Sequence, residues 1–292
     1  ATFHTIDSTP GGVAGRDLAR IWASGDPRFG YAEQSAYEAA ALDDVRKVLG
    51  PIMQNGAIEI GIVGDFDKAA IIKAVAKTYG ALPARRTEFA LNPSAFDITF
   101  PESARSELTH TGEANQGAIF MAWPTQDTWS LDRSRVYGMV RRVFQNRMTE
   151  IIREDMGLTY SPSAGLNYSR LQSGYGYISA SMTSDPQYFD AFETAAKQIA
   201  ANLRQGGITQ DELARVKKPV LESFERTEKE NGSWLRLVTR SQTQPDTLDW
   251  RRSRQSAFED MTPGDLDAAA KTLFDPEALN VVLIKPETQP DQ

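Results

Sequence analysis

Two residues near the middle of the chain, Arg153 and Tyr160, could act together on a substrate. They stand seven positions apart in IIREDMGLTYSPSAG, residues 151–165, where an apolar helix pattern gives way to a strand pattern. Arginine offers five N–H donors in a fixed fork and is always charged, while tyrosine offers one O–H. Two donors held across such a junction can stabilise negative charge that develops on a substrate. The alternative is that Arg153 is a solvated or ion-paired helix residue and that Tyr160 packs within a sheet.

The other chemistry-bearing side chains exclude several kinds of active site. The chain has no cysteine, which removes disulfides, thiolate nucleophiles and thiolate metal ligands. Its two histidines, His4 and His110, lie in no nucleophile motif. The segment HTGEA, residues 110–114, contains H-x-x-E but ends in Ala114 where the zinc motif H-x-x-E-H has its second histidine. Gly112 and the strand-like sequence after it also argue against the helix that this motif requires. We expect no metal site and no cofactor in this chain.

A phosphate-binding loop is a second possibility that the sequence does not favour. The turn GIVGDFD, residues 61–67, follows a strand pattern and precedes a helix pattern, as nucleotide loops do. It lacks the glycine spacing of those loops, and its two aspartates would repel phosphate. A tight turn with Asp65 or Asp67 as helix cap is the simpler interpretation.

Bulk composition narrows the function classes. The 292 residues are 40% hydrophobic and 24% charged, as is usual for a globular protein of about two domains. The net charge of -7 argues against a broad nucleic-acid-binding surface. No apolar run reaches the roughly 18 residues of a membrane helix, and the start, ATFHTIDSTPGG, lacks the features of a signal peptide. We therefore expect no nucleic acid and no membrane among the partners.

The chain contains an internal repeat with an offset of 221 positions. QSAYE at 34–38 matches QSAFE at 255–259, and AIEIGIV at 57–63 falls on ALNVVLI at 278–284 without a gap. Both stretches predict a helix, a turn and a strand with one buried face. The offset is far longer than the periods of solenoid repeats, so it indicates duplication of a whole domain.

The duplication predicts how the domains are arranged. Residues 1–85 would be the carboxy-terminal part of a preceding domain, 86–96 a linker, and 97–292 a complete second copy. Strands, hairpins and helices in this order predict an α+β fold, in which each copy is an antiparallel-rich sheet covered by helices. One hairpin is predicted from TYSPSAGLNYS and YGYISASMTS, near Tyr160. The partial copy should leave apolar surface and a sheet edge uncovered, which favours self-association or a partner.

Three stretches in order resemble one known family. IIREDMGLTYSPSAG, SGYGYISASMTSDPQ and ITQDELARVKKPVLESF look like the carboxy-terminal half of the insulinase/pitrilysin-type zinc peptidases, the inverzincins. SGDPRFG and IEIGIVGDFD resemble the end of the preceding domain in bacterial members, so the resemblance covers nearly the whole chain. It implies duplicated peptidase-like domains whose two halves close around a peptide. It also implies that zinc belongs to the first half, missing here, and that the substrate contacts an Arg and a Tyr seven apart, which match Arg153 and Tyr160.

The function that the resemblance implies is that of a carboxy-terminal fragment of a zinc metallopeptidase. Such a fragment would contribute substrate binding and closure of the catalytic chamber, and it would be catalytically incomplete alone because H-x-x-E-H is absent. Its partners would be a peptide substrate and the missing amino-terminal half, or a partner subunit that carries the zinc site. Similarity to bacterial members implies a periplasmic location. The alternatives are a non-catalytic scaffold or peptide-binding module of the same fold and, from the residues alone, a nucleotide-binding α/β protein.

Overall fold

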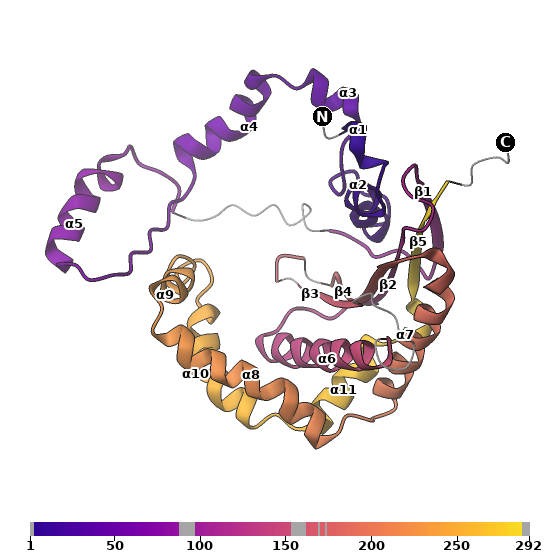
Figure 1. Ribbon diagram of the computed structural model, residues 1–292. Helices are drawn as coiled ribbons and strands as arrows, with labels where there is room; N and C mark the ends of the chain where they lie inside the picture. The colour runs from indigo at the N-terminus through magenta and orange to yellow at the C-terminus, as the bar shows by residue number, and fades with distance from the viewer. Residues whose placement is uncertain (1–2, 88–96, 153–161, 169, 173, 288–292) are drawn as a thin grey trace. The chain divides into compact units, whose positions relative to one another are not determined.

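The structure of the protein is a computed structural model (Figure 1). The residues it describes are 3–87, 97–152, 162–168, 170–172 and 174–287. They form two compact units. The first, here called the sheet unit, comprises Ala1–Gln34, Phe96–Lys218 and Glu259–Gln292. The second, the helical unit, comprises Ser35–Ala95 and Pro219–Phe258.

The sheet unit is organised around a mixed five-stranded sheet (Figure 1). Its strands are β1 (Arg105–His110), β2 (Gly117–Thr125), β3 (Ser163–Tyr168), β4 (Gly176–Ser184) and β5 (Asn280–Pro286). Their order is β1-β5-β2-β4-β3, with β1 parallel to β5 and the other neighbours antiparallel. The predicted α+β class and the predicted β3–β4 hairpin are confirmed.

Helices pack on both faces of this sheet. The helices of the sheet unit are α1 (Phe3–Ile6), α2 (Pro10–Trp22), α6 (Leu131–Glu150), α7 (Phe189–Arg204) and α11 (Pro263–Leu273). On one face, α6 contacts β3, α7 contacts β4 and α11 contacts β2, while α2 packs on β1, β5 and β2 from the other face. The alternation of β2 supplies both cores: Trp123 packs on Phe144 of α6, and Ala118 belongs to the cluster that contains Val13 of α2.

The helical unit contains no strand among its described residues. Its helices are α3 (Gln34–Ala39), α4 (Leu42–Asn55), α5 (Lys68–Lys77), α9 (Asn231–Val238) and α10 (Asp246–Glu259). Helix α8 (Gln210–Glu228) belongs to both units, and the boundary between them falls at Pro219 within it. Across the described part of the chain, no helix is long and apolar enough to cross a membrane.

One sequence prediction is wrong: residues 57–63 do not form a strand. Their counterparts in the repeat, residues 278–284, include most of β5, which is hydrogen-bonded between β1 and β2. A strand is stable when its backbone groups pair with neighbours, and periodicity alone does not supply them. The described residues therefore contain one sheet, whereas the duplication predicts a second, partial one.

The helix that precedes these residues does follow the predicted offset. Helix α4 begins at Leu42 and α11 begins 221 positions later, at Pro263. In α4 the carboxylate of Asp44 accepts from the backbone N–H of Ala41 at 3.1 Å, and in α11 that of Asp265 accepts from Thr262 at 2.8 Å. The duplication and the boundaries 1–85, 86–96 and 97–292 stay predictions, since most of the predicted linker lies outside the described residues.

One predicted helix cap is confirmed, and a capping box precedes α8. The side chain of Asp67 accepts from the backbone N–H of Ala70 at 2.7 Å and caps α5, which supports the simpler interpretation of GIVGDFD. Before α8, Thr209 Oγ1 accepts from Glu212 N–H at 3.2 Å and Glu212 accepts from Thr209 N–H at 2.8 Å. This capping box also ties α8 to α6, because Arg147 donates to Glu212 at 2.7 Å.

The capping box makes stability depend on pH. Burial acts to raise the pKa of Glu212, but hydrogen bonds from Arg147 and Thr209 outweigh it and lower the pKa from 4.5 to about 2. The stabilisation is present above the unfolded pKa of about 4.3 and is lost as pH falls towards 2. We expect Glu212→Gln to lower the free energy of unfolding by about 3 kcal/mol at pH 7. Urea unfolding at pH 7 and pH 3 measures this.

The matched control is Glu225→Gln, which changes an exposed glutamate on the same helix. It should leave the free energy of unfolding nearly unchanged at both pH values. Equal stability of Glu212→Gln and the unchanged protein at pH 7 would show that the ion pair contributes nothing net.

Candidate functional site

The predicted site residues, Arg153 and Tyr160, lie outside the described residues, so their substrate-binding role stays a prediction. Both ends of the segment that carries them are described. Ile152, directly before Arg153, is fully buried, and β3 begins at Ser163. The predicted junction therefore joins the end of α6 to an edge strand of the sheet.

Helix α6 holds the start of that edge strand by three side-chain hydrogen bonds. Gln145 Nε2 donates to the carbonyl of Pro162 at 2.9 Å, and Gln145 Oε1 accepts from Ala164 N–H at 2.7 Å. Arg141 Nη1 donates to the carbonyl of Ala164 at 3.2 Å. These bonds occupy backbone groups that an edge strand otherwise leaves unpaired. They also fix the residues that follow the 153–161 segment to the helix that precedes it.

Small polar side chains line part of the sheet beside this junction. On the same face, Ser163 of β3 is paired with Ser181 of β4, and Gly165 with Ser179. A Cβ added at Gly165 would lie 2.5 Å from Ser179 Oγ, so the serine side chain lies over the glycine. This set, here called the hydroxyl face, offers donors and acceptors to an extended chain. None of its four residues is a histidine, an aspartate or a glutamate.

His110, one of the two histidines of the sheet unit, uses both ring nitrogens within the fold. It is 1% exposed, its Nε2 lies 2.7 Å from the carbonyl oxygen of Gln116, and its Nδ1 accepts from Gly112 N–H at 3.1 Å. As predicted, the H-x-x-E match starts at the end of a strand and not on a helix. Among the described residues no group of three or more His, Cys, Asp or Glu could hold a metal ion. These residues do not fit a zinc site, and the expected absence of a cofactor stays a prediction.

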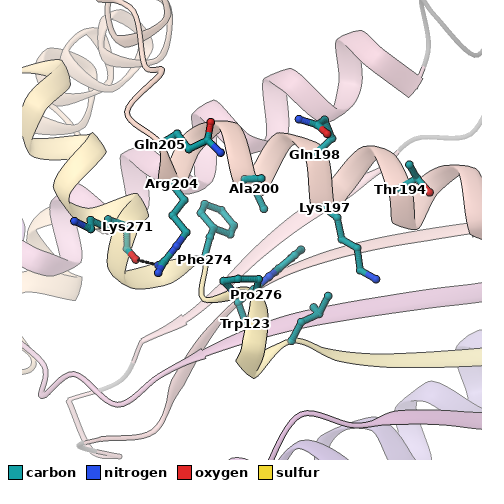
Figure 2. Close-up of a pocket in the computed structure, with 12 residues that line it drawn as sticks. Trp123, Thr194, Lys197, Gln198, Ala200, Arg204, Gln205, Lys271, Phe274 and Pro276 are labelled. Atoms are coloured by element: carbon teal, nitrogen blue, oxygen red, sulfur yellow. Dashed lines mark hydrogen bonds between the residues drawn. The ribbon is translucent and has the colours of Figure 1, made fainter.

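An apolar cavity of about 650 Å³ lies between α7 and the turn that follows α11 (Figure 2). Its apolar lining includes Trp123, Ala200, Phe274, Pro276 and Leu279. Four of these, Trp123, Ala200, Phe274 and Leu279, are buried core residues, so the cavity reaches down to the sheet.

Basic side chains surround this apolar floor. Lys197, Arg204 and Lys271 also line the cavity. Arg204 donates to the carbonyl of Lys271 (Figure 2), and Lys197 pairs with Glu193 at 2.6 Å. A cavity of this size and lining can accept an apolar side chain or a small apolar molecule.

The segment that opens the helical unit has no core of its own. None of residues 31–87, all of which the structure describes, is buried. Of the seventeen exposed large apolar side chains among the described residues, fourteen lie between Tyr31 and Leu82. Exposed apolar residues are common singly, but such a concentration is unusual on the surface of a monomeric protein.

Comparison with known proteins decides the family. A family model described as "Peptidase M16 inactive domain" matches residues 40–220. The chain belongs to the peptidase M16 family. The predicted resemblance to the carboxy-terminal half of these peptidases is confirmed, and the matched residues of this M16 domain include the junction that carries Arg153 and Tyr160.

Individual relatives agree with this assignment. The chain is 32% identical over 292 residues to the chloroplastic stromal processing peptidase of Arabidopsis thaliana, covering 82% of this chain and 23% of that protein. A crystal structure of a peptidase M16 inactive domain from Pseudomonas fluorescens matches 99% of this chain and 68% of its own, with TM-score 0.75 and 16% identity. The periplasmic protease PqqL from Escherichia coli matches 77% of this chain and 25% of its own, with TM-score 0.63 and 16% identity. The chain thus spans about a quarter of the length of the stromal processing peptidase and of PqqL.

The sequence analysis did not predict the side chains that hold the start of β3 to α6, nor those that line the cavity. Gln145 and Arg141 read as ordinary polar positions of a helix, since their partners lie 17 to 23 residues away. A weak signal existed: both precede the junction by whole helical turns, so they share the face that leads to it.

We predict that Gln145→Ala loosens the start of β3. The change leaves the N–H of Ala164 without its partner, which should cost about 1–3 kcal/mol of unfolding free energy. Amide hydrogen exchange at Ala164 should accelerate more than exchange in the central strand β2. The control Gln198→Ala removes an exposed glutamine of α7, whose amide bonds only Asn202, and should change neither quantity. Unchanged exchange at Ala164 in Gln145→Ala would contradict the anchoring role.

Proposed function

We propose that this chain is the carboxy-terminal part of a zinc metallopeptidase and contributes substrate binding and closure of the catalytic chamber. The observation that carries the proposal is the family match over 40–220, which includes the Arg153–Tyr160 junction. In this proposal zinc belongs to the other half of the enzyme. The described residues hold no group that could bind it, so the chain would be catalytically incomplete alone.

Arg153 and Tyr160 are proposed to bind the peptide at its reacting carbonyl. Peptide hydrolysis develops negative charge on that oxygen, and donors aimed at it in advance lower the barrier. Arg153 would bring a planar fork of N–H groups and Tyr160 a single O–H. Anchoring of Pro162 and Ala164 to Gln145 supports this role, because it limits how far the second donor can move from the first.

The partner that carries the zinc is proposed to cover the exposed apolar surface of the helical unit. Val45, Leu49 and Ile52 follow one face of α4 and are 49%, 49% and 59% exposed. Their counterparts in the predicted repeat are Leu266, Ala270 and Leu273 of α11, and each of these is 0% exposed. Val45, Leu49 and Ile52 are here called the α4 strip. If the two segments are copies of one domain, we expect the α4 strip to be covered by a sheet and helices, as its counterpart in α11 is.

A peptide-binding module without catalysis is the second candidate. The observation that favours it is the apolar cavity of about 650 Å³, which could take a side chain of a bound peptide. Peptide binding by the isolated chain, abolished when Ala200→Leu fills the cavity but unaffected by Arg153→Ala, would favour this candidate over the first.

A periplasmic location is proposed from one neighbour. The periplasmic protease PqqL from Escherichia coli shares the fold. Fractionation of cells that express the natural gene tests this location, and recovery with cytosolic markers would contradict it.

The test of the donor pair is kinetic. In the complete enzyme we expect Arg153→Ala and Tyr160→Phe each to lower kcat/KM by about 10²–10³-fold. Arg153→Lys should restore activity only in part, since the planar fork is lost. Zinc content and thermal unfolding should stay unchanged, because neither residue is proposed as a ligand.

The matched control for these variants is Arg142→Ala, which removes an exposed arginine of α6. It should keep the full kcat/KM. Full activity in both Arg153→Ala and Tyr160→Phe would reduce the pair to a helix-end arginine and a sheet tyrosine.

The α4 strip is tested by the mass of the chain in solution. The chain alone should self-associate as its concentration rises, because the strip lacks its cover. The double variant Leu49→Lys/Ile52→Lys should shift the mass measured by light scattering towards that of a monomer. Leu235→Lys, a change at another exposed apolar helix position, should leave the association as it is. A monomeric unchanged protein at every concentration would contradict the proposed interface.

A further inference from the structure

A second cavity, of about 290 Å³, lies within the helical unit between α8, α9 and α10. Its lining contains three arginines, Arg236, Arg251 and Arg254, and no carboxylate. Four hydroxyl side chains complete its polar wall: Ser223, Thr227, Ser233 and Thr247. Phe224 and Trp250 line it as well.

Two of the arginines stack on aromatic rings of the helical unit. The guanidinium of Arg254 lies 4.4 Å from the ring of Phe224, and that of Arg251 lies 4.2 Å from the ring of Trp234. Phe224 in turn packs edge-to-face on Trp250 at 6.2 Å. Aromatic faces hold a guanidinium in place without neutralising its charge.

The hydrogen bonds of these arginines do not use every buried N–H donor of the described residues. Arg254, which is 4% exposed, donates to the carbonyl of Phe224 at 3.2 Å and to Glu228 at 3.0 Å. Arg251 Nη1 donates to Ser233 Oγ at 3.4 Å, whereas its Nη2 is buried and has no partner among the described residues. A buried donor without a partner is costly and commonly marks the place of an ion or water.

The charges around the cavity also do not balance. Three guanidinium groups meet one paired carboxylate, that of Glu228, whose side chain is 60% exposed. Burial lowers the pKa of Arg251, and the nearby charge of Arg254 lowers it further, against the opposing effect of Glu228. An anion in the cavity would oppose this lowering of the Arg251 pKa, because its negative charge favours the protonated guanidinium.

We propose that this cavity binds a phosphate or phosphoryl group. A dianion matches the two positive charges that remain after Glu228 is counted, and arginine forks suit tetrahedral oxyanions. Ser233 accepts from Arg251, so its own O–H is free to donate to the anion. The cavity is larger than one phosphate, which leaves room beside Trp250 for a small organic group. The site is independent of the proposed peptidase function.

Calorimetric titration of the whole chain tests the site. Inorganic phosphate and phenyl phosphate are titrated separately in chloride buffer at pH 7.5, which distinguishes a free ion from a phosphoryl group on a larger molecule. We expect saturable binding of at least one of them, and tighter binding of phenyl phosphate if the space beside Trp250 is used. The bound anion should also raise the temperature of thermal unfolding.

Two variants and one control decide the outcome. Arg251→Gln and Arg236→Gln should each weaken binding by about tenfold or more, and Arg236 is an exposed residue whose replacement leaves the core intact. Arg252→Gln, at an exposed arginine paired with Asp249, should leave binding unchanged. The proposal is overturned if neither anion binds at millimolar concentration, or if the control weakens binding as much as Arg251→Gln and Arg236→Gln do.

Discussion

Edge-to-face packing of three aromatic rings fixes the helix on which the candidate site depends. Trp123 of β2 packs on Phe144 of α6 at 5.8 Å and on Phe274 after α11 at 5.4 Å, and the two phenylalanines contact each other at 4.9 Å. All three are buried, so α6 cannot shift along the sheet without opening the core. The described end of α6 therefore has a defined place above the strands. Arg147, paired with Glu212, holds the last turn of α6 from its other side.

This arrangement makes a fixed platform, and the described residues contain no group of side chains that could hold a metal ion. The anchoring of β3 to α6 and the hydroxyl face suit the holding of an extended chain, and His110 is consumed by the fold itself. The helical unit differs in kind: residues 31–87 bury nothing, so their apolar side chains need a cover supplied from elsewhere. Both features support the proposal that this chain is part of a larger enzyme. The arginine cavity stands apart, because it is complete within the helical unit.

Most strands and a helix cap could be predicted from local patterns in the sequence, because they depend on residues that are close together in the chain. Alternating apolar residues predicted β2, β4 and β5, and Asp67 in the turn GIVGDFD predicted the cap of α5. The prediction of a strand at 57–63 was wrong because pairing depends on neighbours that periodicity does not reveal. The convergence of Arg236, Arg251 and Arg254 could not be predicted either, since it arises from the packing of α9 on α10 and leaves no motif. Gln145 was missed for the same reason.

The central claim is that Arg153 and Tyr160 bind the reacting carbonyl of a peptide held against a zinc site in the other half. A crystal structure of the complete enzyme with a phosphinic peptide, which mimics the tetrahedral intermediate, tests it most directly. We expect a guanidinium nitrogen of Arg153 and the hydroxyl oxygen of Tyr160 each to lie about 2.7–3.1 Å from a phosphinic oxygen. Side chains of both residues turned away into the sheet unit, beyond about 5 Å from every ligand atom, would contradict it.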